Sequence, residues 1–254
     1  MASRLFRIQY VSDLHLERYS RVKNSSFAKP VAPYLALAGD IGYPSTPTWN
    51  SFLHYANKNW DHVFYVAGTK EYDRSISFNK QHMEMKDNLR QFKNITLLDT
   101  FNPSFYFPKE NVAMVGSTLW SFVKNENYTN ALHCLDKAIL EKHIEFWTYQ
   151  KANIVMLTHH MPSHKLISPR FETKDNDAYT SNCEYLMNKQ VRAWIYGRTH
   201  NVSSRTIKNT LAVVNARGYP MEQVPGFTNQ TFIELDVGPD EEGANIDLAM
   251  AAMA

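Results

Sequence analysis

The amino-acid sequence predicts an α/β fold in which buried strands deliver polar side chains to one site. Five apolar runs of strand length each end abruptly in polar, ligand-type residues. These runs are IQYVSDLHLE (8–17), YLALAGD (34–40), VFYVAGTKEYD (63–73), IVMLTHH (154–160) and WIYGRTH (194–200). Continuous apolar runs are typical of parallel strands that are buried on both faces. Because ligands bind beyond the carboxyl ends of such strands, the polar residues are expected to converge.

The first half of the chain alternates predicted strands and helices. Its elements are, in order, a strand at residues 5–11, a polar loop at 19–33, a strand at 35–38, a helix at 48–59, a strand at 63–67 and an amphipathic helix at 77–92. Both helices are predicted from apolar side chains at helical spacing, and Thr46 or Thr48 could cap the first of them.

The second half begins with short strands that have no helices between them, which suggests a second sheet or an antiparallel extension (α+β). They cover residues 95–98, 104–107 and 112–115. The longest helical pattern covers residues 130–151, with an apolar face that includes Leu132, Leu135, Ile139, Ile144 and Trp147. The remaining predicted elements are a strand at 154–157, a functional loop or lid at 162–182, a short helix at 183–189, and strands at 192–196, 203–207, 211–214 and 231–236.

Length and composition favour one globular domain. The chain has 254 residues and a formal net charge of +2, so it can bury one large core. We expect the domain to cover residues 1–238 and the acidic, then Ala/Met-rich tail 239–254 to be disordered. The absence of a basic stripe argues against nucleic acid as a partner, and the sequence does not indicate the oligomeric state.

Two further features favour a cytoplasmic protein that does not bind membranes. The amino terminus enters the first strand without the apolar segment of a signal peptide, and no apolar run reaches the length of a membrane span. Cys134 and Cys183 lie far apart in the sequence and do not have metal-site spacing. We interpret them as reduced thiols in a reducing compartment.

Aspartate and histidine gather at the predicted strand ends, where they suggest a metal site. The candidate ligands are Asp13, His15, Asp40, His159 and His200. A lone aspartate or histidine is more often a helix cap or a surface residue, but recurrence at several strand ends favours metal binding. Carboxylate and imidazole ligands together suit borderline divalent ions such as Mn, Fe, Zn or Ni.

The ordered series DLH, GD, GTKE, THH and GRTH resembles the calcineurin-like metallophosphoesterases. Their pattern is D-x-H, G-D, G-N-H-[ED], H-H or H-x, and G-H-x-H. The resemblance runs from about residue 7 to residue 218 and includes the landmarks LAGDIG, GSTLW and NARGYP. It implies two mixed sheets packed face to face and flanked by helices. It also implies hydrolysis of a phosphoric ester at a site that holds two metal ions.

Carried over residue by residue, the resemblance implies a complete first metal site and an incomplete second one. The first ion would be held by Asp13, His15, Asp40 and His200. The second ion would take Asp40 and His159, but Thr69 replaces the asparagine of the pattern and Arg198 replaces a histidine. An arginine cannot ligate a metal because its guanidinium stays protonated. We therefore expect one divalent ion at most.

Two interpretations of the substituted site stay open. In the first, the chain is a phosphoric ester hydrolase with low or altered activity, in which Lys70 (at the position of the family's catalytic histidine) and Arg198 work with Asp40. These two cations, together with His160, would then bind the phosphate. In the second, it is a catalytically inactive relative that binds a phosphorylated small molecule or a protein partner.

Either interpretation places the two cations close together. We expect Lys70 and Arg198 near His159, each satisfied by an acidic neighbour, an aromatic face or an anion. Glu71 and Asp73 are the candidate counter-charges because they are near in sequence.

Overall fold

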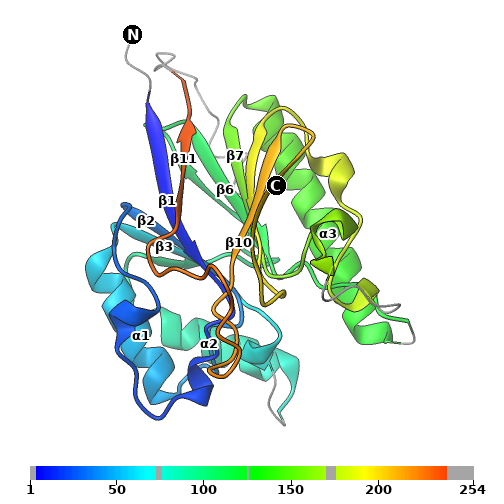
Figure 1. Cartoon of the computed structure of the whole chain (residues 1–254). Helices are drawn as coiled ribbons and strands as arrows, with labels where there is room; N and C mark the ends of the chain where they lie inside the picture. Colours follow the sequence, from blue (N-terminus) through cyan, green and yellow to red (C-terminus); the bar gives the residue numbers. More distant parts are fainter. Residues whose placement is uncertain (1–3, 73–75, 125, 170–175, 239–254) are drawn as a thin grey trace.

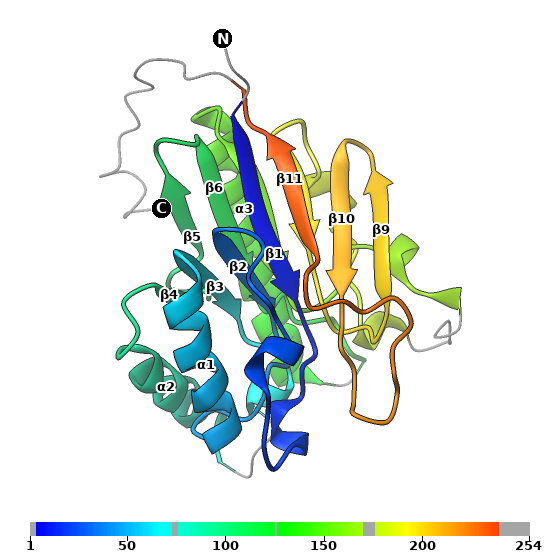
Figure 2. The same ribbon diagram turned by 60° about the vertical axis from the view of Figure 1, so that its left-hand side comes forward.

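Two mixed β-sheets packed face to face form the centre of the molecule, and helices cover their outer faces (Figures 1 and 2). The computed structural model describes residues 4–72, 76–124, 126–169 and 176–238. The first sheet contains, in spatial order, β11 (Phe232–Asp236), β1 (Leu5–Val11), β2 (Tyr34–Ala38), β3 (His62–Val66) and β4 (Ile95–Leu97). The second contains β5 (Ser104–Phe107), β6 (Val112–Ser117), β7 (Asn153–Thr158), β8 (Val191–Ile195), β10 (Thr210–Asn215) and β9 (Val202–Ile207).

The central strands of both sheets are parallel, and only edge strands run antiparallel. In the first sheet, β1 to β4 pair in parallel and β11 pairs antiparallel with β1. In the second sheet, β6, β7, β8 and β10 pair in parallel, with β5 and β9 antiparallel at the two edges. The carboxyl ends of the parallel strands therefore lie together at one edge of each sheet.

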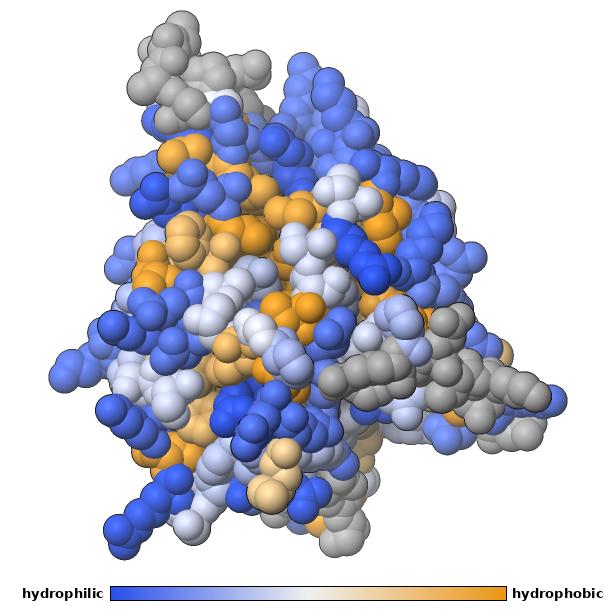
Figure 3. Space-filling view, in the orientation of Figure 1, coloured by the Kyte–Doolittle hydropathy of each residue, from blue (hydrophilic) through white to orange (hydrophobic). Residues whose placement is uncertain are grey.

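Three hydrophobic cores explain why the strand sequences are apolar throughout. Along β2, Leu35 and Leu37 face the core under the helices, while Ala36 and Ala38 face the second sheet. Each central strand thus has two buried faces, as its continuous apolar run predicts. Figure 3 shows hydrophobic side chains between β11 and β10, where the core between the sheets reaches the surface among hydrophilic residues.

The helices cover the two outer faces. The first sheet is covered by α1 (Pro47–Asn59) and α2 (Phe78–Leu89), and the second by α3 (Asn127–Tyr149). Thr46 occupies the cap position of α1, but its hydroxyl donates to the carbonyl of Tyr43 at 2.8 Å and does not cap the helix. No helix in the described ranges combines the length and the hydrophobicity that crossing a bilayer requires.

The apolar face predicted for the long helix is partly wrong. Leu135 is 47% exposed, whereas the buried stripe contains a carboxylate and an imidazole. This stripe consists of Asp136, Leu140, His143, Ile144 and Trp147. The buried carboxylate of Asp136 accepts a hydrogen bond from the backbone N–H of Leu119 at 2.7 Å. A pattern based on apolar residues alone could not include such a position.

The short helix predicted at residues 183–189 is also wrong, because only a 3₁₀ turn forms there, at Glu184–Leu186. The side-chain oxygen of Asn188 accepts hydrogen bonds from the backbone N–H groups of Gln190 (2.9 Å) and Val191 (3.3 Å). These bonds turn the chain directly into β8. The tail predicted to be disordered, residues 239–254, lies outside the described residues.

Candidate metal centre

The polar residues that follow five parallel strands converge on one site, as the sequence predicts. Asp13 follows β1, Asp40 follows β2, Lys70 follows β3, His159 follows β7 and His200 follows β8. Potential ligand atoms of Asp13, His15 and His200 lie within 4.8 Å of one another, and so do those of Asp13, Asp40 and His159. Asp13 therefore belongs to both groups.

Four residues of the site have a left-handed backbone conformation that is uncommon outside glycine. Their φ angles are 51° for Asp13, 48° for His15, 51° for Asp40 and 67° for Arg198. Each such residue costs about 1–3 kcal/mol, and such residues cluster at functional sites. Backbone bonds hold this geometry: the N–H of Asp13 donates to Gly39 at 3.0 Å, and that of His15 donates to Asp40 at 3.0 Å.

A carboxylate lies behind each of the imidazoles of His15 and His200. Nδ1 of His15 lies 3.3 Å from a carboxylate oxygen of Glu17, and Nδ1 of His200 contacts the carboxylate of Glu222. Both rings therefore direct Nε2 into the site, and the two Nε2 atoms lie 3.0 Å apart. Metal-binding histidines usually have such a partner on the second ring nitrogen.

His159 is oriented in the same way by the main chain. Its Nδ1 contacts the carbonyl oxygen of Ala38 at 2.9 Å, and its Nε2 lies 3.4 Å from Oδ1 of Asp40. Burial lowers the pKa of His159 to about 4, so the ring is neutral near pH 7. A neutral imidazole is the form that binds metals.

The donor atoms fit a divalent cation. Both carboxylate oxygens of Asp13 are buried and lack hydrogen-bond partners in the part of the chain that is described. Burial, together with the nearby charge of Asp40, raises the pKa of Asp13 well above its usual range. A cation would relieve this cost. The 3.0 Å between Nε2 of His15 and Nε2 of His200 also fits one ion, because two nitrogen ligands at right angles, each about 2.1 Å away, would be about 3 Å apart.

Gly68 gives Asp40 its position. A Cβ at this glycine would overlap a carboxylate oxygen of Asp40 and its backbone nitrogen. The glycine of the GTKE motif therefore allows the main chain after β3 to approach the carboxylate closely. The backbone N–H of Lys70 then donates to Oδ1 of Asp40 at 2.7 Å.

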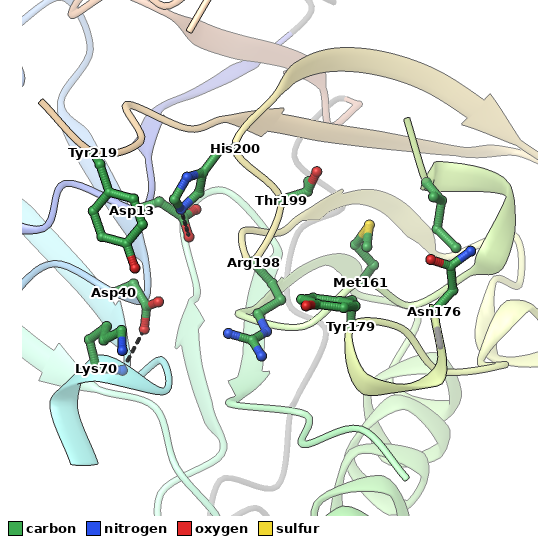
Figure 4. Close-up of a pocket in the computed structure, with 11 residues that line it drawn as sticks. Asp13, Asp40, Lys70, Met161, Asn176, Tyr179, Arg198, Thr199, His200 and Tyr219 are labelled. Carbon is green, nitrogen blue, oxygen red and sulfur yellow. Dashed lines mark hydrogen bonds and ion pairs between the residues drawn. The ribbon is translucent and has the colours of Figure 1, made fainter. Parts of the chain in front are cut away.

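Arg198 lies beside the second group and is held by two contacts. Its Nη1 donates to the hydroxyl of Thr69 at 3.1 Å, and its Cζ lies 4.9 Å from the ring centre of Tyr179. The Thr69 hydroxyl in turn lies 3.3 Å from both carboxylate oxygens of Asp40. Figure 4 shows Arg198 between Asp40 and Tyr179. An aromatic face, one of the three kinds of partner expected for this cation, is thus present.

A cavity of about 460 Å³ opens onto these groups. Figure 4 shows Asp13, Asp40, Lys70 and Tyr219 close together, while Met161, Tyr179 and Asn176 lie on the other side of Arg198. The lining residues are Asp13, Asp40, Lys70, Met161, Ile167, Asn176, Tyr179, Arg198, Thr199, His200 and Tyr219. The loop at 162–182 contributes three of them, and its role as a functional loop or lid stays a prediction.

Glu71 has a different partner set from the one expected. It is 1% exposed, and one carboxylate oxygen accepts a hydrogen bond from the hydroxyl of Tyr65 at 2.6 Å. Its other donors are the backbone N–H groups of Asp40, Ile41 and Gly68. Glu71 therefore connects the ends of β2 and β3 and is not seen paired with the cations. Asp73, the other expected counter-charge, lies outside the described residues.

His160 is buried next to the site and does not line the cavity. Its Nδ1 contacts the hydroxyl of Ser121, and burial, with a further effect from Arg198, lowers its pKa well below the usual value. The phosphate-binding role of His160 stays a prediction.

Sequence reasoning missed four residues of the site. Glu17 and Glu222 lie behind the histidines, and Tyr179 and Tyr219 line the cavity. Two signals were available. Glu17 ends the first apolar motif, and Tyr219 lies in the landmark NARGYP. The roles of Tyr179 and Glu222 depend on contacts between distant segments.

Comparison with solved structures identifies the fold. Phosphopantetheinyl hydrolase from Mycobacterium tuberculosis superposes with a TM-score of 0.73 at 14% identity, over 93% of this chain and 97% of that one. A protein assigned as a 5′-nucleotidase from Staphylococcus aureus gives a TM-score of 0.54 at 16% identity, over 85% of this chain and 49% of that one. The chain is therefore a metallophosphoesterase-fold protein with two overlapping, buried candidate metal-ligand groups. The predicted fold class is confirmed.

Comparison of sequences adds one relative. An uncharacterised protein of Acanthamoeba polyphaga mimivirus is 27% identical, over 90% of this chain and 96% of its own length. No protein-family model matches the sequence.

Proposed function

We propose that this protein is a phosphoric ester hydrolase that works with one divalent ion held by Asp13, His15, Asp40 and His200. The observation that carries the proposal is the pair of Nε2 atoms from His15 and His200, 3.0 Å apart beside the buried carboxylate of Asp13, which accepts no hydrogen bond from the described residues. A cation would compensate for the burial of the two carboxylate oxygens of Asp13. The cavity next to it gives an ester access to the site.

The ion would polarise a phosphoryl oxygen and activate water, and the chain would position the ester. Arg198 uses one N–H on Thr69 and keeps further donors for phosphoryl oxygens. The ring of Tyr179 holds its guanidinium in place. Lys70 lines the same cavity and adds a second positive charge. In this proposal the two cations take over the charge of a second ion.

The size of the cavity supports a small phosphorylated molecule as the ligand. About 460 Å³ is within the roughly 300–1,000 Å³ of typical small-molecule sites. The names of the two structural neighbours, a phosphopantetheinyl hydrolase and a 5′-nucleotidase, point to the same class of ligand. A cytoplasmic location is part of the proposal and agrees with two cysteines that form no disulfide.

A second candidate is a phosphate-binding protein without turnover. Arg198 and Thr69 lie next to Asp40, where the resemblance implies ligands of the second ion. Loss of these ligands would remove the cation that stabilises the leaving oxygen. The protein would then bind a phosphorylated ligand and release it unchanged.

One set of measurements separates these candidates. The metal content of the purified protein is determined, and phosphomonoesterase and phosphodiesterase activities are assayed with Mn, Fe, Zn and Ni. The hydrolase predicts one ion per chain and metal-dependent turnover that Arg198→Ala reduces. Arg205→Ala is the control, because Arg205 is an exposed residue of β9 whose side chain donates to the carbonyl oxygen of Lys165. Metal binding without turnover favours the second candidate, and a protein that binds no divalent ion contradicts both.

A further inference from the structure

Tyr219 lies directly against the candidate metal ligands, on the loop that follows β10. Its ring stacks on the imidazole of His15, with centroids 4.1 Å apart and an interplanar angle of 29°. The His200 ring meets it edge-on at 4.9 Å. The guanidinium carbon of Arg18 lies over the ring, 5.4 Å from its centre.

These contacts leave the hydroxyl as the part of Tyr219 that is offered to a ligand. A stacked imidazole occupies one ring face, so the guanidinium of Arg18 has to cover the other. The ring is therefore not a platform on which a base or another flat group could stack. Its hydroxyl points into the cavity towards Asp40 and Lys70 (Figure 4). The backbone N–H of Tyr219 donates to the carboxylate of Glu222 at 2.9 Å, which holds the loop in place.

A hydrogen-bond donor at this position has a chemical use. The chain has a lysine at position 70 where the resembling family has a histidine that donates a proton near the leaving group. A phosphoryl oxygen bound by Arg198 gains stabilisation from each further donor directed at it. A phenol keeps its proton at neutral pH and is therefore a donor under those conditions.

We infer that the hydroxyl of Tyr219 donates a hydrogen bond to a phosphoryl oxygen of the bound ester or phosphate. This inference rests on the proposed function, because it requires a phosphorylated ligand in the cavity. It adds a third donor beside Lys70 and Arg198, placed on the side of the cavity formed by the loop after β10. No proton is transferred, and no bond other than the hydrogen bond is formed.

The substitution Tyr219→Phe tests the inference because it removes only the hydroxyl. The ring stays against His15 and Arg18, so the metal content should not change. We expect the affinity for orthophosphate, measured by calorimetry on the metal-loaded protein, to fall about 10-fold. The value of kcat/KM for the best ester should fall about 10- to 100-fold. Tyr149→Phe is the matched control, because Tyr149 is 83% exposed at the end of α3.

A second substitution separates the hydroxyl from the ring. Tyr219→Leu also removes the stack on His15, so metal affinity should fall together with phosphate affinity. If Tyr219→Phe lowers metal content as much as Tyr219→Leu does, the residue acts on the metal ligands and the inference is wrong.

Different experimental results would contradict the hydrogen bond of Tyr219 and the proposed hydrolase function. A wild-type protein that binds orthophosphate but hydrolyses no ester contradicts the hydrolase, while weaker phosphate binding by Tyr219→Phe would still support the hydrogen bond. A Tyr219→Phe protein with unchanged phosphate affinity and unchanged kcat/KM overturns the inference and leaves the hydrolase intact. A wild-type protein that neither hydrolyses esters nor binds orthophosphate overturns both.

Discussion

The Nε2 atoms of His15 and His200 lie 3.0 Å apart, although 185 positions separate these residues in the sequence. A glutamate lies near the other nitrogen of each ring, Glu17 for His15 and Glu222 for His200. Two imidazole nitrogens can lie this close when one donates a hydrogen bond to the other, or when both bind the same cation. The unpartnered carboxylate of Asp13 beside them favours a cation.

Asp13→Asn should have opposite effects on metal binding and on stability. It removes a negative charge that belongs to both ligand groups, so the ion should be lost from a protein that otherwise binds one ion per chain at most. In metal-free protein, the same change removes a buried carboxylate without hydrogen bonds. The free energy of unfolding should then rise by about 1–3 kcal/mol. Elemental analysis and denaturant unfolding in a chelator measure the two effects.

The control for this change is Asp177→Asn, because the side chain of Asp177 is 80% exposed. It should alter neither metal content nor stability. Two fully occupied metal ions in the wild type would contradict the one-ion prediction. A metal-free Asp13→Asn protein that is less stable than the wild type would contradict the destabilising effect expected of this buried carboxylate.

Restoring the family pattern should raise any hydrolase activity. Thr69→Asn, Lys70→His and Arg198→His together would supply the two missing ligands of a second ion and the missing histidine. Single changes should have little effect, because groups that act as a unit contribute together. Metal content and kcat/KM of the triple variant and the three single variants test this. A triple variant that is slower than an efficient wild type would show that Lys70 and Arg198 are themselves an effective catalytic solution.

The buried stripe of α3 can be tested with two leucines on the same helix. Leu140 is fully buried, whereas Leu135 is 47% exposed. Leu140→Ala should lower the free energy of unfolding by about 2–5 kcal/mol, because it leaves a cavity against the second sheet. Leu135→Ala should change it by about 0.5 kcal/mol or less. Equal effects in urea unfolding would mean that the helix is rotated relative to the structure described above.

Asp136 should make stability depend on pH. Burial raises its pKa from 3.8 to about 7, so the folded state binds a proton that the unfolded state has already lost. Stability relative to Asp136→Asn should therefore fall as the pH rises from about 4 to about 7 and stay constant above that. The total change should be on the order of 4 kcal/mol at most. Urea unfolding of both proteins across this range gives the difference.

The control for this experiment is Asp87→Asn, whose wild-type carboxylate is 56% exposed and lies on α2. Its stability difference from the wild type should not follow the same pH curve. A flat difference for Asp136→Asn would show that the Asp136 carboxylate is ionised in the folded protein across this range.

The local sequence determined the strands, their burial and the place of the site. Apolar runs such as YLALAGD were sufficient because a strand buried on both faces must be apolar at every position. The aspartates and histidines at the strand ends were evident for the same reason, since each apolar run stops where its polar residues begin. The sequence pattern therefore predicted β1 with the observed bounds, Leu5–Val11.

Only the tertiary structure decided which side chains far apart in the sequence contact one another through hydrogen bonds, ion pairs and packing. Nothing near Arg198 in the sequence indicates Tyr179, and nothing near His200 indicates Glu222, because both partners come from separate loops. The buried carboxylate of Asp136 accepts a hydrogen bond from the backbone N–H of Leu119, which is 17 positions away. A one-dimensional pattern records which residues are polar. The partner of a buried polar group is set by the packing of the two sheets and their loops.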